Sequence, residues 1–286
     1  MATHCPSHPM VVGVSVLPAL RRGSFGAALL LIGLGSGTAV AQDLVADLIR
    51  NRGCPSCDLR LTTLRGLQMG GFDLKGTNLR EADLKETDLS GAQLARSDLR
   101  RTELERATLV EADLTGASMR GVDMEKANLN RARFGNADLR DADLNETRLE
   151  GTDFTASDLR NASLIRASAV GANFSNAKMD GADLERADVS GADFSGARLM
   201  QADLDRLIAR GASFRGADLS GVRLSSADMT DADFGNANLT DALLRNTRLP
   251  GADLGSVRGL SQDRIINACG DAATRLPKGI TLKPCS

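Results

Sequence analysis

The 286-residue sequence predicts an all-β solenoid, and three repeating features predict it. From Leu59 to Leu254 every fifth residue is large and apolar, and 37 of these 40 positions hold Leu, Met or Phe. A small residue, most often Ala, stands two positions before most of them. Phenylalanine recurs at every twentieth residue between Phe134 and Phe234. Together these periods indicate a coil of fixed size that repeats about ten times.

A period of five is typical of neither an amphipathic helix nor a simple alternating strand. Five residues turn a helical wheel by roughly 140°, so the large residues would scatter around a helix without forming a buried face. In an extended segment, residues two apart point the same way, so the small and the large residue both face inward. The two remaining residues form a corner. Glycines at corner positions supply the positive φ that a tight turn needs, as at Gly91, Gly116, Gly171 and Gly216.

The number of corners in each coil follows from the aromatic residues. Like side chains stack when they lie above one another in successive coils, so a spacing of twenty predicts four five-residue units per coil. Ala169, Val189 and Ala209 replace the large residue in the unit before a Phe and leave volume for its ring. The predicted interior column consists of Phe134, Phe154, Phe174, Phe194, Phe214 and Phe234.

Units such as Ala82-Asp83-Leu84-Lys85-Glu86 resemble the consensus of the pentapeptide-repeat family, and the resemblance covers about two thirds of the chain. It implies a right-handed quadrilateral β-helix whose interior is filled by columns of Leu and Ala. We expect this β-helix to span residues 57–256. The family has many roles, so the resemblance indicates the fold far more sharply than the function.

Residues 1–41 have the features of a signal peptide of an exported protein. An apolar run from Phe25 to Gly37 follows Arg21-Arg22, and Ala39-Val40-Ala41 is a small-x-small cleavage pattern. The run is shorter than the span of about 20 residues that a membrane helix needs. We expect cleavage near Ala41 and a periplasmic or secreted protein with no transmembrane span. An uncleaved anchor, twin-arginine in place of general export, and Met10 in place of Met1 as the start remain alternatives.

Charge and cysteine content agree with export. Loss of the leader leaves 33 basic and 37 acidic residues, a formal charge of −4, which does not favour broad capture of nucleic acid. The leader also removes Cys5, so four cysteines remain. They lie at the two ends of a rod roughly 48 Å long, estimated at about 4.8 Å per coil. Only the pairs Cys54–Cys57 and Cys269–Cys285 can then form within one chain. A metal site at Cys54 and Cys57 is an alternative that lacks partner ligands.

Both ends of the β-helix need a cap, because an end coil exposes apolar interior and unpaired strand edges. We expect an N-terminal cap over residues 42–56, with a helix from Asp43 to Arg52 that buries Leu44, Val45, Leu48 and Ile49 and ends at Gly53. We expect a C-terminal cap over residues 257–286. Its helix would run from Ser261 to Cys269, with Ser261 as N-cap, Ile265 and Ile266 buried, and Gly270 as the stop.

The sequence predicts no catalytic, cofactor-binding or metal-binding residue. Both histidines, His4 and His8, lie in the leader, and the chain contains no Tyr or Trp. Histidine-based catalysis and stacking on sugars or single-stranded nucleic acid are therefore not expected. Asp precedes the central residue in 19 of the 40 units, as at Asp83, Asp113, Asp143 and Asp193. We interpret these residues as turn-forming and solubilising, since the repeat itself places Asp there.

One surface column exceeds what the repeat consensus explains. Arginine recurs at the coil spacing in the first six coils, and in four of them Asp stands two residues earlier, at Asp58, Asp98, Asp138 and Asp158. One interpretation is a neutralised, structural ladder of Asp and Arg; the other is an edge that docks an anion or a partner. The candidate interaction ladder consists of Arg60, Arg80, Arg100, Arg120, Arg140 and Arg160.

Three functions remain in view. The first is a non-enzymatic exported scaffold or protein-interaction rod in the cell envelope, with an unidentified protein partner and no nucleic acid. The second is a DNA-mimicking, topoisomerase-protecting protein like the quinolone-resistance members of the family, which the fold permits, although those members are cytoplasmic dimers with strongly acidic surfaces. The third is a carboxylate-based metal-dependent enzyme, which only common residues favour. The sequence leaves open whether the rod is a monomer or a homodimer stacked through its C-terminal coil.

Overall fold

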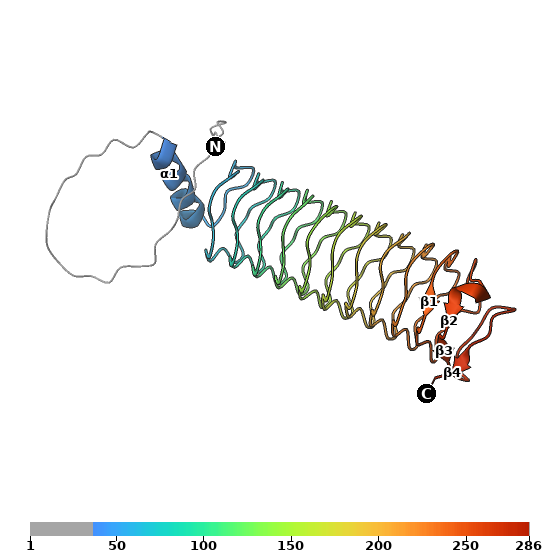
Figure 1. The fold of residues 1–286 in the computed structure, drawn as a ribbon. Coiled ribbons are helices and arrows are strands. Elements are labelled where there is room, and N and C mark those ends of the chain that lie inside the picture. Colours follow the sequence, from blue (N-terminus) through green and yellow to red (C-terminus); the bar gives the residue numbers. More distant parts are fainter. Residues whose placement is uncertain (1–36, 286) are drawn as a thin grey trace.

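A computed structural model describes residues 37–285, and Figure 1 shows them as a long rod of stacked coils. Most of the predicted leader, residues 1–41, lies outside the described residues. Parallel β-bridges join residues twenty apart without interruption, from Gly53–Asp73 to Asn238–Arg258. The predicted coil of four five-residue units is therefore confirmed, and the regular ladder begins four residues before the expected start at residue 57.

The corners are hydrogen-bonded turns, except for the one from Leu244 to Thr247. In a representative one, the Ala82 N–H donates to the Leu79 carbonyl at 3.0 Å, and Glu81 has a φ of 57°. A positive φ at the third of four residues is characteristic of a type II turn. Glycine occupies this position at many corners, as predicted, with φ between 64° and 67° at Gly91, Gly116, Gly171 and Gly216.

The interior consists of stacked columns of identical or similar side chains. The Leu and Ala positions are buried along the whole rod. The six predicted phenylalanines form a continuous stack, with ring centroids 4.7 to 5.2 Å apart and interplanar angles of 5 to 12°. The smaller residues Ala169, Val189 and Ala209 are buried beside them. Such packing fixes the register of successive coils.

The N-terminal cap is helix α1, Gly37–Arg50, which Figure 1 shows at the first end of the rod. Leu48 is fully buried, but Ile49 is 48% exposed, contrary to the prediction. The helix also ends two residues earlier than expected. The Gly53 N–H donates to the Leu48 carbonyl and Arg52 adopts a φ of 51°, which is a Schellman ending. No helix within residues 37–285 is long and apolar enough to cross a membrane.

The predicted C-terminal helix from Ser261 to Cys269 is wrong. The chain forms a three-residue 3-10 helix, η1 (Gln262–Arg264), and the Ser261 side chain donates to Asp263 and does not cap the helix. Strand β2 (Ile265–Ile266) then pairs with β1 (Leu244–Arg245), because β-branched residues extend the open edge of the last coil. Ile265 is half-buried and Ile266 is 36% exposed, so neither forms the expected buried pair.

The tail adds two further short strands. β3 (Cys269–Gly270) pairs in parallel with β4 (Lys283–Pro284), so Gly270 lies in a strand and does not stop a helix. The Cys269–Cys285 disulfide joins the same two segments, with Cα atoms 4.8 Å apart. Pro284 lacks an N–H and Lys283 is charged, two features that limit further pairing of an exposed strand edge.

Both predicted disulfides are present. The Cys54–Cys57 pair lies at the opposite end, with Cα atoms 5.5 Å apart. Cys54 stands at a central position of the five-residue register and Cys57 at the following small-residue position. These two inward-facing positions flank every corner of the rod and usually hold Leu and Ala. At the first corner they hold two cysteines, which form a disulfide.

Candidate functional site

The aspartates that precede the central residue have a structural role in the turns. Asp83 Oδ1 accepts a hydrogen bond from the Lys85 N–H at 3.1 Å, and Asp193 Oδ1 accepts one from the Ser195 N–H at 2.8 Å. Asp113 and Asp143 do the same with the residue two positions later. This bond satisfies a donor at the corner, which explains the abundance of Asp. Within the part of the chain that the structure describes, no three His, Cys, Asp or Glu residues are placed to hold a metal ion.

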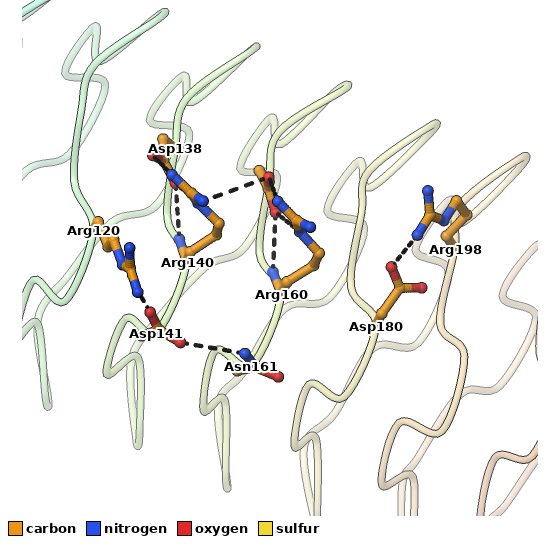
Figure 2. A network of polar contacts seen from close by, with 9 residues as sticks. Arg120, Asp138, Arg140, Asp141, Arg160, Asn161, Asp180 and Arg198 are labelled. Atoms are coloured by element: carbon orange, nitrogen blue, oxygen red, sulfur yellow. Dashed lines mark hydrogen bonds and ion pairs between the residues drawn. The ribbon is translucent and has the colours of Figure 1, made fainter.

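The arginines of the candidate ladder form one column along an edge of the rod, because each stands one residue after a central Leu or Met in successive coils. Figure 2 shows Arg120, Arg140 and Arg160 in three consecutive coils. Four of the six bind the Asp two residues earlier through Nε and Nη2, at 2.5 to 2.8 Å. These four are Arg60, Arg100, Arg140 and Arg160.

The bound guanidinium groups change the acidity of their partners. The side-chain hydrogen bond from Arg100 holds the pKa of Asp98 below its usual value, although partial burial opposes this. Arg60 lowers the pKa of Asp58, and Arg140 that of Asp138, in the same way. At physiological pH these pairs are therefore ionised and neutralise four of the six charges in the column.

Arg80 and Arg120 differ from the other four because Asn78 and Ser118 occupy the positions where the others have Asp. Arg80 Nε and Nη2 both donate to the adjacent Glu81, at 3.1 and 3.0 Å. Arg120 Nε reaches Asp141 in the next coil, at 2.9 Å, as Figure 2 shows. The two arginines thus lack the Asp two residues earlier and bind a carboxylate of the next surface column instead, Glu81 or Asp141.

A surface hollow of about 440 Å³ lies over this part of the ladder. The residues that directly follow the ladder arginines form a second column at the corners, which we call the corner column. In this column Gly121 stands between Arg101 and Asp141, and all three residues line the hollow. A Cβ at Gly121 would have no neighbour closer than the Arg101 Cγ at 3.8 Å, so the space above it is open. The complete lining is Arg80, Arg100, Arg101, Arg120, Gly121 and Asp141.

The same edge changes character after Arg160. Asp180 takes the next place in the column and binds Arg198, and Met200, Ser220 and Thr240 follow. A second hollow of about 550 Å³ lies here, and no arginine lines it. Its lining is Asn161, Asp180, Gly181, Met200, Gln201, Ser220, Gly221 and Asp241.

Sequence reasoning identified the arginine column but missed the residues beside it. Glu81, Arg101, Gly121 and Asp141 are also spaced by twenty, so the coil register alone places them in one column next to the arginines. That signal was present in the sequence. The sequence does not show which carboxylate each arginine binds, because a guanidinium at this edge reaches carboxylates both in its own unit and in the next coil.

Comparison with known proteins agrees with this architecture. The family described as Pentapeptide repeats matches the chain in eight copies, over residues 57–92, 87–125, 117–155, 157–196 and 197–236. No curated protein matches the chain. Two solved structures are similar to it. HetL is a pentapeptide repeat protein involved in heterocyst differentiation regulation from the cyanobacterium Nostoc sp. strain PCC 7120. It is 28% identical, with 73% of this chain and 94% of HetL covered and a TM-score of 0.55.

The second structure is a trypsin-treated variant of QnrB1, a plasmid-mediated fluoroquinolone resistance protein. It is 24% identical, with 65% of this chain and 89% of QnrB1 covered and a TM-score of 0.53, a likeness that concerns the fold alone. Such proteins are right-handed quadrilateral β-helices, as predicted for this chain. The matching family is defined by a structural repeat.

Proposed function

The chain belongs to the pentapeptide repeat family, and from this premise we propose that it is an exported, non-enzymatic rod that binds another protein in the cell envelope. The uninterrupted ladder of parallel bridges from Gly53 to Arg258 carries the proposal. Each coil is fixed to its neighbours by backbone hydrogen bonds and by stacked core side chains, so the surface columns keep constant spacing. A rigid surface of this kind binds with little loss of conformational entropy.

The cysteines support export. Disulfides Cys54–Cys57 and Cys269–Cys285 occupy opposite ends of the rod, and such bonds persist in oxidising compartments. Each lies where the regular ladder begins or ends, and therefore protects a terminus from fraying. The predicted leader over residues 1–41 supplies the route to such a compartment.

The arginine ladder is the proposed docking edge, because its side chains are exposed or half-buried and their recurrence in six coils exceeds what the repeat consensus explains. Protection of a topoisomerase by mimicry of DNA is less favoured. A DNA mimic presents unpaired carboxylates, whereas Asp58, Asp98, Asp138 and Asp158 are bound by arginine, and the formal charge of the full chain is only −2.

Export is tested by measuring the intact mass of the protein from cytoplasmic, periplasmic and medium fractions, with and without reduction. We expect a periplasmic or extracellular species that starts at Gln42 and gains about 4 Da on reduction, one hydrogen for each thiol of two disulfides. A full-length, reduced, cytoplasmic species would overturn the proposal, and topoisomerase protection would be tested next.

Partner binding is tested in the same cells with a photo-cross-linking residue at Ser118, between the arginines of the ladder. The matched control has the photo-cross-linking residue at Asn238, which lies in the same surface column but in the C-terminal half of the rod. We expect a discrete cross-linked protein from Ser118 that is absent from the Asn238 control. Equal cross-linking at both sites, or none at Ser118, would contradict a docking edge in the first half of the rod.

A further inference from the structure

We propose that the hollow over Arg80, Arg100 and Arg120 binds an acidic peptide segment of the partner, whose Asp or Glu carboxylates complete the arginine column. This inference rests on the proposed function, since it names the chemistry of the partner that the rod would bind. It goes further by confining recognition to three of the ten coils and to one class of side chain.

The column itself shows which chemistry its arginines bind. Arg60, Arg100, Arg140 and Arg160 each hold a carboxylate in a two-pronged contact. Arg80 and Arg120 have Asn78 and Ser118 in place of that Asp. The Asp carboxylate of the pattern is therefore missing at two positions, 78 and 118. These positions are two coils apart and lie on either side of the coil that contains Arg100. A carboxylate from another chain fits the same geometry.

The arginines at the hollow have unused hydrogen-bond donors. A guanidinium carries five N–H donors, but Arg120 makes one side-chain bond, through Nε, and its side chain is 57% exposed. Arg101 is 72% exposed, and its one ionic contact is to Glu81 at 3.6 Å. Four arginines line the space, and Asp141 lines it with them. Glu81 and Asp98 pair with Arg80 and Arg100 beside it. Asp138, itself bound to Arg140, lies close enough to interact with Arg100 and Arg120. The local charge is positive and accessible.

The space between these groups depends on Gly121. Its neighbours in the corner column are Arg101 and Asp141, and only the missing side chain leaves room for a ligand above the backbone. Exposed ion pairs are individually weak, so a partner gains affinity mainly by contacting several arginines together. An extended acidic segment lying along the rod does so, because the guanidinium groups recur once in every coil.

Carboxylates are favoured over nucleic acid phosphates by the rest of the surface. Binding of a single strand normally combines phosphate contacts with stacking of bases on aromatic rings. The chain has no Tyr or Trp, and the phenylalanines of the rod interior are buried. The hollow therefore offers charge and hydrogen-bond donors without a platform for bases.

The second hollow on the same edge provides an internal control. It has the same corner position and two glycines, Gly181 and Gly221, but Asp180 and Asp241 line it and no arginine does. An acidic peptide should avoid this half. The rod would thus bind its partner in one position along its length.

The test uses the purified, oxidised full chain and a fluorescein-labelled peptide of ten glutamates, with binding followed by fluorescence anisotropy at about 50 mM salt, where screening is modest. Gly121→Asp places a carboxylate in the hollow. Aspartate tolerates this turn, because Asp141 and Asp241 occupy the same corner column with a φ of 58°. Gly221→Asp, in the second hollow, is the matched control.

We expect wild type and the Gly221→Asp variant to bind the peptide alike, and Gly121→Asp to bind about tenfold more weakly. Asp141→Asn should strengthen binding several-fold, since it frees Arg120, and Asn161 adopts the same turn conformation with a φ of 59°. Gain of affinity is an effect that loss of folding does not produce.

Three outcomes would overturn the inference: no binding of the glutamate peptide by wild type, equal effects of the two glycine variants, or tighter binding of a ten-nucleotide oligothymidylate than of the peptide. Cross-linking from Ser118 in cells that persists despite any of these results would leave the proposed function standing and remove only the acidic-peptide inference.

Discussion

The ring of Phe174 lies 4.7 Å from that of Phe194 in the next coil, and the two planes are inclined by only 6°. Both rings are fully buried. Each ring therefore contacts the one before and the one after it, so its removal leaves a cavity bounded by two other rings and by the coil backbone. The stack links six successive coils into one cooperative interior.

Replacement of Phe174 by Ala should lower the free energy of unfolding by about 3 to 5 kcal/mol, as for other buried aromatic side chains. The loss is measured by urea denaturation followed by circular dichroism. Ser175→Ala, at the adjacent outward position, is the control and should change stability little. Equal unfolding midpoints for the two variants would contradict the structural importance of the stack.

The paired arginines predict a pH dependence of stability. Arg100 lowers the pKa of Asp98 in the folded protein below the usual value of 3.8. The carboxylate of a group with a lowered folded pKa stabilises the fold above its unfolded pKa, and this contribution is lost as the pH falls through the folded pKa. Arg100→Gln should therefore be less stable than wild type at pH 7, and the difference should shrink below about pH 4. A difference that stays constant down to pH 2 would exclude this pairing as its cause.

The repeat made most of the fold predictable from sequence. A column such as Phe134 to Phe234 fixes the coil length without knowledge of the coordinates, because stacked positions must be occupied by compatible residues. The turn conformation followed for the same reason, since Gly91 and Gly171 stand where the structure has a φ of 64°. The 40 equivalent units together outweigh the weak structural preference of any single residue.

The ends were less predictable, because no repeat constrains them. Ile265 and Ile266 match a helical pattern as well as a strand, and the free edge of β1 decides in favour of the strand. The candidate site shows a similar limit. Asp58 and Asp98 were identified as partners of their arginines, but the contact between Arg120 and Asp141 joins two coils and depends on side-chain geometry.

Substitutions at the corner residue Gly171 should show the energetic cost of backbone strain alone. Gly171 has a φ of 64°, and no atom lies within 4 Å of the position that a Cβ would occupy. Gly171→Val should destabilise the rod by about 1 to 2 kcal/mol, the cost of a left-handed backbone for a residue with a Cβ. Gly171→Asn should cost less, because Asn tolerates this region and Asn176 adopts a φ of 58° at another corner. Thermal unfolding compares the two, and an equal loss for both would contradict residue-specific backbone strain as the cause.

The two disulfides should stabilise the rod to different extents. Cys269 and Cys285 are 16 residues apart, and Cys54 and Cys57 only three. Removal of the longer link by Cys269→Ser with Cys285→Ser should cost about 3 kcal/mol, against about 2 kcal/mol for Cys54→Ser with Cys57→Ser, because a longer loop restricts the unfolded chain more.

Loss of the Cys269–Cys285 disulfide should also cause unfolding that is confined to the C-terminal tail. Loss of the Cys269–Cys285 bond leaves β4 held by its short pairing with β3 and by the hydrogen bonds between Thr281 and Gln262, so a protease should cut within residues 276–285 while the coils stay intact. Limited proteolysis with mass spectrometry of the fragments identifies the cut. Cleavage that begins inside the coils would show that the tail closes the rod and that its release exposes the interior of the last coil.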